Sequence, residues 1–123
     1  MIANDTNNKI LYKELSYKLN GVLFNVHNKL GRFSREKQYG DELESLLKDV
    51  GIEYKREFVV SDGNRVDFLI DNQIILDIKA KRLVTKDDYY QILRYLQSGG
   101  FKLGLIVNFR NTYLKPKRII NLH

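Results

Sequence analysis

The chain has 123 residues, which is enough for one domain with one hydrophobic core and excludes two independently folded domains. Hydrophobic residues make up 43% and charged residues 29%, so the composition is that of a folded protein and not of a disordered one. The absence of cysteine excludes disulfides, thiolate metal sites and a cysteine nucleophile, and His27 and His123 are the only histidines. Any metal would therefore have to bind to carboxylates. The formal net charge of +6 favours a polyanionic partner.

No apolar stretch approaches the ~20 residues that a membrane crossing requires. The first ten residues, MIANDTNNKI, also lack the positive-then-apolar order of a secretory signal. We therefore expect a cytoplasmic protein with no membrane partner.

Two helices are predicted in the first half of the chain. Over residues 11–30, apolar residues recur three or four positions apart, and Gly31 is the expected C-cap. Over residues 39–50 the same spacing recurs and ends at Gly51. We expect Ser34 to be the N-cap of this second helix.

From residue 52 onward the apolar period changes to two. This pattern predicts three strands over 53–61, 65–70 and 74–80, separated by turns at 62–64 and 71–73. Short turns between consecutive strands predict an antiparallel meander.

The remaining chain predicts one more helix and one more strand. Thr85-x-x-Asp88 has the arrangement of a capping box and opens a helix that ends at Gly99-Gly100. A fourth strand follows over 103–108, and 118–120 forms either an edge strand or a frayed end. The order ααβββαβ predicts a single α/β domain over 1–123, with a core of about 21–109, a polar N-terminal tip and a short C-terminal tail.

Two aspartates are expected to face each other in the meander. Because side chains alternate along a strand, Val66, Phe68 and Ile70 should share an apolar core face with Ile74, Leu76 and Ile78. On the opposite face, a three-residue turn places Asp67 directly across from Asp77, with Lys79 beside it. Facing carboxylates are destabilising unless Lys79, Arg65 or a bound cation neutralises them. A divalent ion such as Mg²⁺ is one solution, and a solvated face with ordinary ion pairs is the alternative.

Three further polar residues lie on helices next to this sheet. Glu36 is at the edge of the inward stripe of the second helix and should point toward the sheet, although it also suits a first helical turn for electrostatic reasons alone. Gln91 and Tyr95 are one turn apart on the third helix, where an ordinary helix flank is the alternative explanation.

Taken together, Glu36, Asp67, Asp77-Ile78-Lys79 and Gln91-x-x-x-Tyr95, in this order on these elements, resemble the PD-(D/E)XK nuclease superfamily. A narrower resemblance, from about residue 21 to 109, is to the GxxExxY family of small bacterial and archaeal proteins. The segments that carry it are 26–31, Glu36-x-x-Tyr39, 66–70, 78–80 and 105–109. The chain has Phe33 where that family has glycine, and Asp77-Ile78-Lys79 where it more often has Glu-x-Lys.

The resemblance implies a restriction-endonuclease-like α/β core with a mixed central sheet flanked by helices. It also implies hydrolysis of phosphodiester bonds, in DNA rather than RNA. Mg²⁺, with Mn²⁺ as a substitute, would be held by Asp67, Asp77 and the Ile78 carbonyl, with Glu36 joining directly or through water. Lys79 would orient the attacking water or stabilise the transition state. Gln91 and Tyr95 would support the site or touch backbone phosphates.

Basic side chains outside this set are candidates for contact with nucleic acid. We single out Lys81 and Arg82, which follow the catalytic strand, together with Arg65 and Arg94. A homodimer or a partner protein could supply specificity to so small a domain. Two other functions fit the sequence: a catalytically silent module that binds nucleic acid or regulates a partner, and a structural protein whose charged sheet face is capped by another chain.

Overall fold

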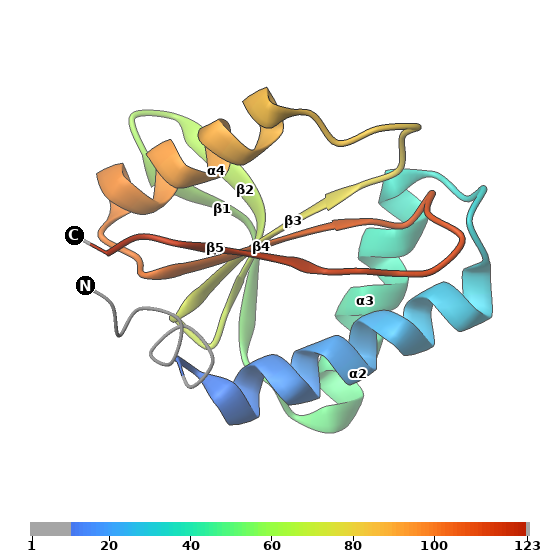
Figure 1. The fold of residues 1–123 in the computed structure, drawn as a ribbon. Coiled ribbons are helices and arrows are strands. Elements are labelled where there is room, and N and C mark those ends of the chain that lie inside the picture. The colour runs from blue at the N-terminus through green and yellow to red at the C-terminus, as the bar shows by residue number, and fades with distance from the viewer. Residues whose placement is uncertain (1–10, 123) are drawn as a thin grey trace.

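The structure, a computed structural model, describes residues 11–122 and contains within them three helices and one five-stranded sheet (Figure 1). The helices are α2 (Lys13–Leu30), α3 (Glu36–Val50) and α4 (Lys86–Gly99). The strands are β1 (Tyr54–Ser61), β2 (Asn64–Ile70), β3 (Ile74–Lys79), β4 (Leu103–Asn108) and β5 (Lys117–Ile120). The predicted order of elements is confirmed, and the tail forms an edge strand. The predicted polar N-terminal tip lies outside the described residues.

The predicted helix ends agree with the structure except at the start of α3. Gly31 follows α2 at φ +73°, a conformation that glycine adopts without strain, and its amide donates to the His27 carbonyl. Thr85 caps α4 and shares a reciprocal capping box with Asp88. The expected N-cap Ser34 is wrong: Arg35 precedes the first residue of α3, and the Ser34 hydroxyl donates to the Leu30 carbonyl instead.

The sheet has the order β1-β2-β3-β4-β5 and is mixed. The first three strands form the predicted antiparallel meander. Strand β4 pairs in parallel with β3, because α4 carries the chain back to the starting end of the sheet, and β5 returns antiparallel to β4. The carboxyl ends of β3 and β4 therefore lie side by side.

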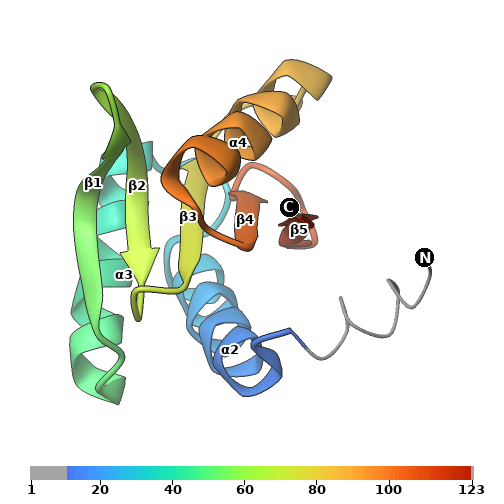
Figure 2. The same ribbon diagram turned by 90° about the vertical axis from the view of Figure 1, so that its left-hand side faces the viewer.

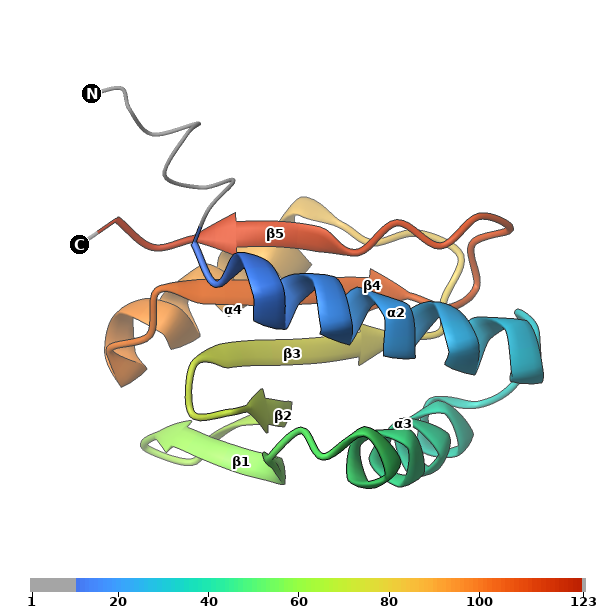
Figure 3. The ribbon, with the colours of Figure 1, turned by 90° about the horizontal axis from the view of Figure 1, so that it is seen from below.

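Helices cover both faces of the sheet (Figures 2 and 3). Helices α2 and α3 pack on one face, over a core that includes Tyr39, Phe68 and Phe109. Helix α4 packs on the other face, over a smaller core with Leu69, Ile75 and Ile92. The Tyr39 and Phe109 rings stack with centroids 4.2 Å apart, which joins the start of α3 to the end of β4. No helix within residues 11–122 is both long and apolar enough to cross a bilayer.

One expectation for the core face of β2 is wrong. Val66 lies in the core under α4, whereas Phe68 lies in the core under α2 and α3. The alternation breaks because the β1–β2 ribbon changes face at the opposed positions Glu57 and Asp67, where Glu57 adopts a left-handed φ of +53°. Asp67 therefore lies at the position in β2 where the buried side chains change from one face of the sheet to the other.

Gly104 allows α4 to lie close to the sheet. A Cβ added at Gly104 would stand 2.7 Å from Ile92 Cγ2, inside the packed core. We expect Gly104→Ala to lower the free energy of unfolding by about 1–3 kcal/mol, measured by urea denaturation. The matched control is Gly21→Ala on α2, where a Cβ meets nothing within 4 Å and a small gain from helix propensity is expected. Equal effects of the two substitutions would contradict this packing argument.

Candidate functional site

Asp67 lies where the pairing between β2 and β3 ends. The ladder covers the pairs Ile70–Ile74, Leu69–Ile75 and Phe68–Leu76 and goes no further. At the next position the Asp67 carboxylate accepts a hydrogen bond of 2.7 Å from the Ile78 amide. A side-chain oxygen thus replaces a backbone carbonyl as the partner of this amide, and the half-buried carboxylate is held on β3.

Asp67 and Asp77 form a close acidic pair, as the register of the turn predicts. Burial, together with the hydrogen bond and the negative charge of Asp77, raises the pKa of Asp67 to about 8, while the Ile78 amide opposes this rise. Asp77 itself is only 9% exposed. Two carboxyl groups are therefore held together in partly desolvated surroundings where their repulsion is strong.

Lys79 completes this group. Its ammonium lies 2.8 Å from the Asp77 carboxylate. Burial by itself would lower the pKa of Lys79, but the hydrogen bond and charge of Asp77, with smaller contributions from Asp88 and Asp67, raise it above its ordinary value. Lys79 is therefore a cation throughout the neutral range and cannot serve as a proton acceptor there.

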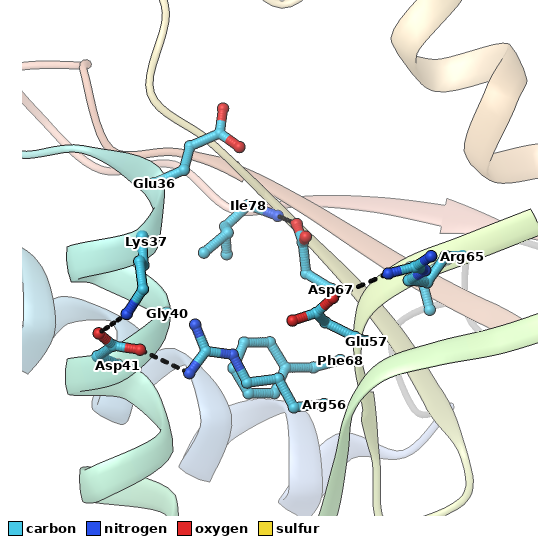
Figure 4. Close-up of a pocket in the computed structure, with 11 residues that line it drawn as sticks. Glu36, Lys37, Gly40, Asp41, Arg56, Glu57, Arg65, Asp67, Phe68 and Ile78 are labelled. Atoms are coloured by element: carbon cyan, nitrogen blue, oxygen red, sulfur yellow. Dashed lines mark hydrogen bonds and ion pairs between the residues drawn. The ribbon is translucent and has the colours of Figure 1, made fainter.

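A cleft of about 430 Å³ opens beside Asp67, between α3 and the β1–β2 ribbon (Figure 4). Glu36, the first residue of α3, lines it on one side, and Asp67 and Ile78 line it on the other. Glu36 is exposed, and its charge contributes to raising the pKa of Asp67. The structure thus places Glu36 on the same cleft as Asp67, whereas Asp77 and Lys79 are not among the cleft residues.

The acids nevertheless do not gather tightly enough to form a three-ligand cluster. No group of three Asp, Glu or His side chains able to hold a metal ion exists within residues 11–122. The close acidic pair is Asp67 with Asp77, and Glu36 stands apart across the cleft. The expected meeting of all three acids in one notch is therefore only partly seen.

Arg56 forms the inner wall of the cleft and is already partnered. From β1 it donates to Asp41 at 2.7 Å and to Glu44 at 3.0 Å, both on α3. Its guanidinium fills the space where a Cβ at Gly40 would stand. This network ties β1 to α3.

Gln91 and Tyr95 lie on α4, away from the cleft. Both are half-buried, and Tyr95 packs against the core under α4 together with Leu69 and Ile75. Within residues 11–122, neither side chain forms a hydrogen bond or an ion pair with Asp77 or Lys79. The ordinary helix-flank explanation accounts for Tyr95, and a role of either residue in the site stays a prediction.

The basic residues expected to contact nucleic acid differ in their surroundings. Lys81 forms an ion pair of 2.6 Å with Asp88, and Arg65 forms an exposed pair of 3.0 Å with Glu57. Arg94 is exposed on α4. Arg82 is exposed and lines a second cavity, at the end of the sheet where β3 stops.

Sequence reasoning missed the part that Asn108 plays. Buried at the end of β4, its side chain accepts from the Lys81 amide (3.1 Å) and donates to the Lys81 carbonyl (2.6 Å). This pair of bonds fixes the segment that follows Lys79. The signal was available, because polar residues at the carboxyl ends of neighbouring parallel strands meet at one edge of the sheet.

The family model described as the PD-(D/E)XK nuclease superfamily matches residues 13–120. The chain therefore belongs to the PD-(D/E)XK nuclease superfamily, and its α/β fold agrees with the core of that superfamily. No match is found among curated proteins or among solved structures. Membership supports a nuclease-like function in general, with a nucleic-acid substrate.

Members of this superfamily generally use divalent metals, and the residues present fit such an ion. Carboxylate oxygens are the ligands that Mg²⁺ prefers, usually one or two per ion with water completing the shell. Burial and the neighbouring Asp77 raise the pKa of Asp67, so ionising both carboxyl groups is unfavourable even with Lys79 beside Asp77. A divalent ion would supply positive charge to the pair.

Proposed function

We propose that the protein is a metal-dependent nuclease that hydrolyses phosphodiester bonds, with DNA as its substrate. The observation that carries this proposal is the Asp67–Asp77 pair with Lys79 at 2.8 Å, in a chain of the nuclease superfamily. Within the superfamily we place the chain near the GxxExxY family, on the segments quoted above.

Asp67 and Asp77 are the proposed ligands of Mg²⁺ or Mn²⁺, together with the Ile78 carbonyl. Glu36 faces Asp67 across the open cleft and would bind the same ion through water, because it does not join the close pair. When bound, the ion supplies positive charge to the scissile phosphate and promotes ionisation of the attacking water.

The proposed role of Lys79 follows from its charge. Because its raised pKa keeps the ammonium protonated, Lys79 can act by donating hydrogen bonds to the phosphate oxygens as negative charge grows on them. Asp77 positions this ammonium. A protonated ammonium can fill either role expected from the sequence, orienting the attacking water or stabilising the transition state, but it cannot act as a base.

Several finer expectations remain proposals. A supporting or phosphate-contacting role of Gln91 and Tyr95 remains a proposal; both lie on α4, which covers the sheet face to which alternation assigns Asp77 and Lys79. The cytoplasmic location and a homodimer or partner protein stay predictions.

The test is cleavage of labelled single-stranded, double-stranded and branched DNA with Mg²⁺ or Mn²⁺, compared with EDTA. We expect cleavage only with a divalent ion. Asp77→Asn should abolish both cleavage and calorimetric Mn²⁺ binding, because it removes one of the two close ligands.

Asp62→Asn is a suitable control, since Asp62 lies in an exposed turn far along β1–β2 from the acidic pair. It should leave cleavage and metal binding unchanged. Salt-sensitive DNA binding without cleavage in the presence of either Mg²⁺ or Mn²⁺ would contradict the proposed nuclease activity. It would favour the catalytically silent module that binds nucleic acid.

A further inference from the structure

A second cavity, of about 580 Å³, lies at the end of the sheet where β3 and β4 finish. We call it the basic groove. Its lining includes Arg32 from the loop after α2, Arg82 from the loop after β3, and Arg110 and Lys115 from the loop after β4. Tyr113 lines it as well, and the other two lining residues are uncharged. Within residues 11–122 the groove thus has four cations and no acid. Its volume is in the ~300–1,000 Å³ range of ligand sites.

The groove lies at the end of the sheet where the strand that carries Asp77 and Lys79 stops. Arg82 is three residues beyond Lys79 on the same chain segment, and Asn108 and Arg110 hold this segment in place. A polyanion in the groove would therefore pass close to Lys79.

Two of the four cations, Arg32 and Arg110, are held by hydrogen bonds to backbone carbonyls. Arg32 Nε donates to the Arg110 carbonyl at 2.8 Å, and Arg110 Nε donates to the Arg32 carbonyl at 2.9 Å. Arg110 Nη2 also reaches the Ala80 carbonyl at 3.3 Å. These bonds fix two like-charged side chains side by side before any ligand arrives, so binding an anion there requires little ordering.

No carboxylate neutralises these cations in the part of the chain that the structure describes. Ion pairs there involve Lys29, Lys37, Arg56, Arg65, Lys79 and Lys81, and none involves Arg32, Arg82, Arg110 or Lys115. Other cations, such as Lys55 and Lys102, also take part in none of these ion pairs, but the groove brings four cations together without an acid. This local excess of positive charge favours phosphate groups.

Two exposed aromatic rings accompany this charge. Phe33 is 73% exposed, with the guanidinium carbons of Arg32 and Arg110 at 4.8 and 5.4 Å from its ring centre, and Tyr113 is 80% exposed. Exposed aromatic rings next to cations offer faces on which unpaired bases can stack. Bases within a duplex are already stacked on each other and cannot reach such rings.

We propose that the basic groove binds a single-stranded segment of nucleic acid, with its phosphates on Arg32, Arg82, Arg110 and Lys115 and unpaired bases stacked on Phe33 and Tyr113. The proposal rests on the proposed nuclease function only in taking nucleic acid as the ligand. According to this proposal, the nucleic-acid segment that approaches the acidic pair is unpaired, as in a single strand, a flap or a frayed end.

The test measures binding by fluorescence anisotropy in EDTA, so that neither metal nor cleavage is involved. The probes are a labelled oligothymidine of about a dozen nucleotides, an oligouridine of the same length and a duplex of equal length. We expect the single strands to bind more tightly than the duplex. Phe33→Ala and Tyr113→Ala should each weaken single-strand binding by about 5–100-fold and leave duplex binding almost unchanged.

Charge is tested separately with the double variant Arg82→Ala/Lys115→Ala. Its slope of log affinity against log salt should be smaller by about 1.4 for the single strands, since two phosphate contacts are lost. Tyr17→Ala, 81% exposed on α2, is the aromatic control. Lys102→Ala, at the opposite end of β4, is the cation control. Thermal unfolding of every variant verifies that the fold is retained.

Wild-type affinity of Phe33→Ala and Tyr113→Ala for the single strands, or tighter binding of the duplex, would overturn the proposal. Preference for oligothymidine or for oligouridine separates DNA-type from RNA-type strands, which differ in the 2′-hydroxyl and in the thymine methyl, and either preference supports the proposal. Absence of cleavage by the wild type under any divalent ion would refute the nuclease proposal alone, because the binding assay contains no metal.

Discussion

Replacing Lys79 with methionine should reduce the cleavage rate by about 10²–10³-fold without impairing metal binding. The substitution removes a cation that lies 2.8 Å from Asp77 and keeps most of the aliphatic stem that fills the same space. Because a positive charge next to the acidic pair repels a second one, Mn²⁺ affinity should stay equal or increase. Single-turnover cleavage at saturating Mn²⁺ measures the cleavage rate, and titration calorimetry measures the Mn²⁺ affinity.

The matched control for this experiment is Lys81→Met. Lys81 also pairs with an acid, Asp88 at 2.6 Å, and lies two residues further along the same segment. It should change cleavage far less than Lys79→Met does. If Lys79→Met loses Mn²⁺ binding together with activity, the lysine maintains the shape of the site and does not act on the phosphate.

Asp67→Asn should stabilise the metal-free protein at alkaline pH while it abolishes cleavage. The folded pKa of Asp67 is raised from 3.8 to about 8, so between about pH 4 and pH 8 the unfolded chain releases a proton that the folded chain retains. The unfolded state then binds fewer protons, and the free energy of unfolding falls as pH rises through this window. Above pH 8 this loss is complete.

An asparagine avoids the loss because it is neutral at every pH and its amide oxygen can still accept from the Ile78 amide. In EDTA at about pH 9 we expect the variant to be more stable by on the order of 2–4 kcal/mol, measured by urea denaturation. At pH 4 the wild type and Asp67→Asn should have nearly equal free energies of unfolding. The exposed Asp62→Asn should show no such dependence, and a parallel pH profile for wild type and Asp67→Asn would contradict the raised pKa.

Local patterns predicted the elements of the fold well. The spacing of apolar residues located all three helices, and the change to period two located the meander, since both patterns reflect direct burial. The break at Glu57 and Asp67 was not predictable, because a left-handed residue in a strand depends on tertiary contacts. Val66 was assigned to the wrong core for this reason.

The candidate site was predicted in part. The facing of Asp67 and Asp77 followed from the length of one turn, and the position of Lys79 from strand alternation. How far Glu36 lies from that pair depends on how α3 packs on the sheet, which no local pattern reveals. The basic groove escaped prediction because its cations come from three loops that are distant in sequence.

The parallel pairing of β3 with β4 has a consequence for the order in which the protein is completed. Strand β3 carries Asp77 and Lys79, and its parallel neighbour β4 follows α4 in the chain. Asn108, at the end of β4, holds the backbone of Lys81. Contacts of such long sequence separation form late in folding. A nascent chain from which β3 has emerged but β4 has not would therefore hold Asp77 and Lys79 without the strand that fixes them.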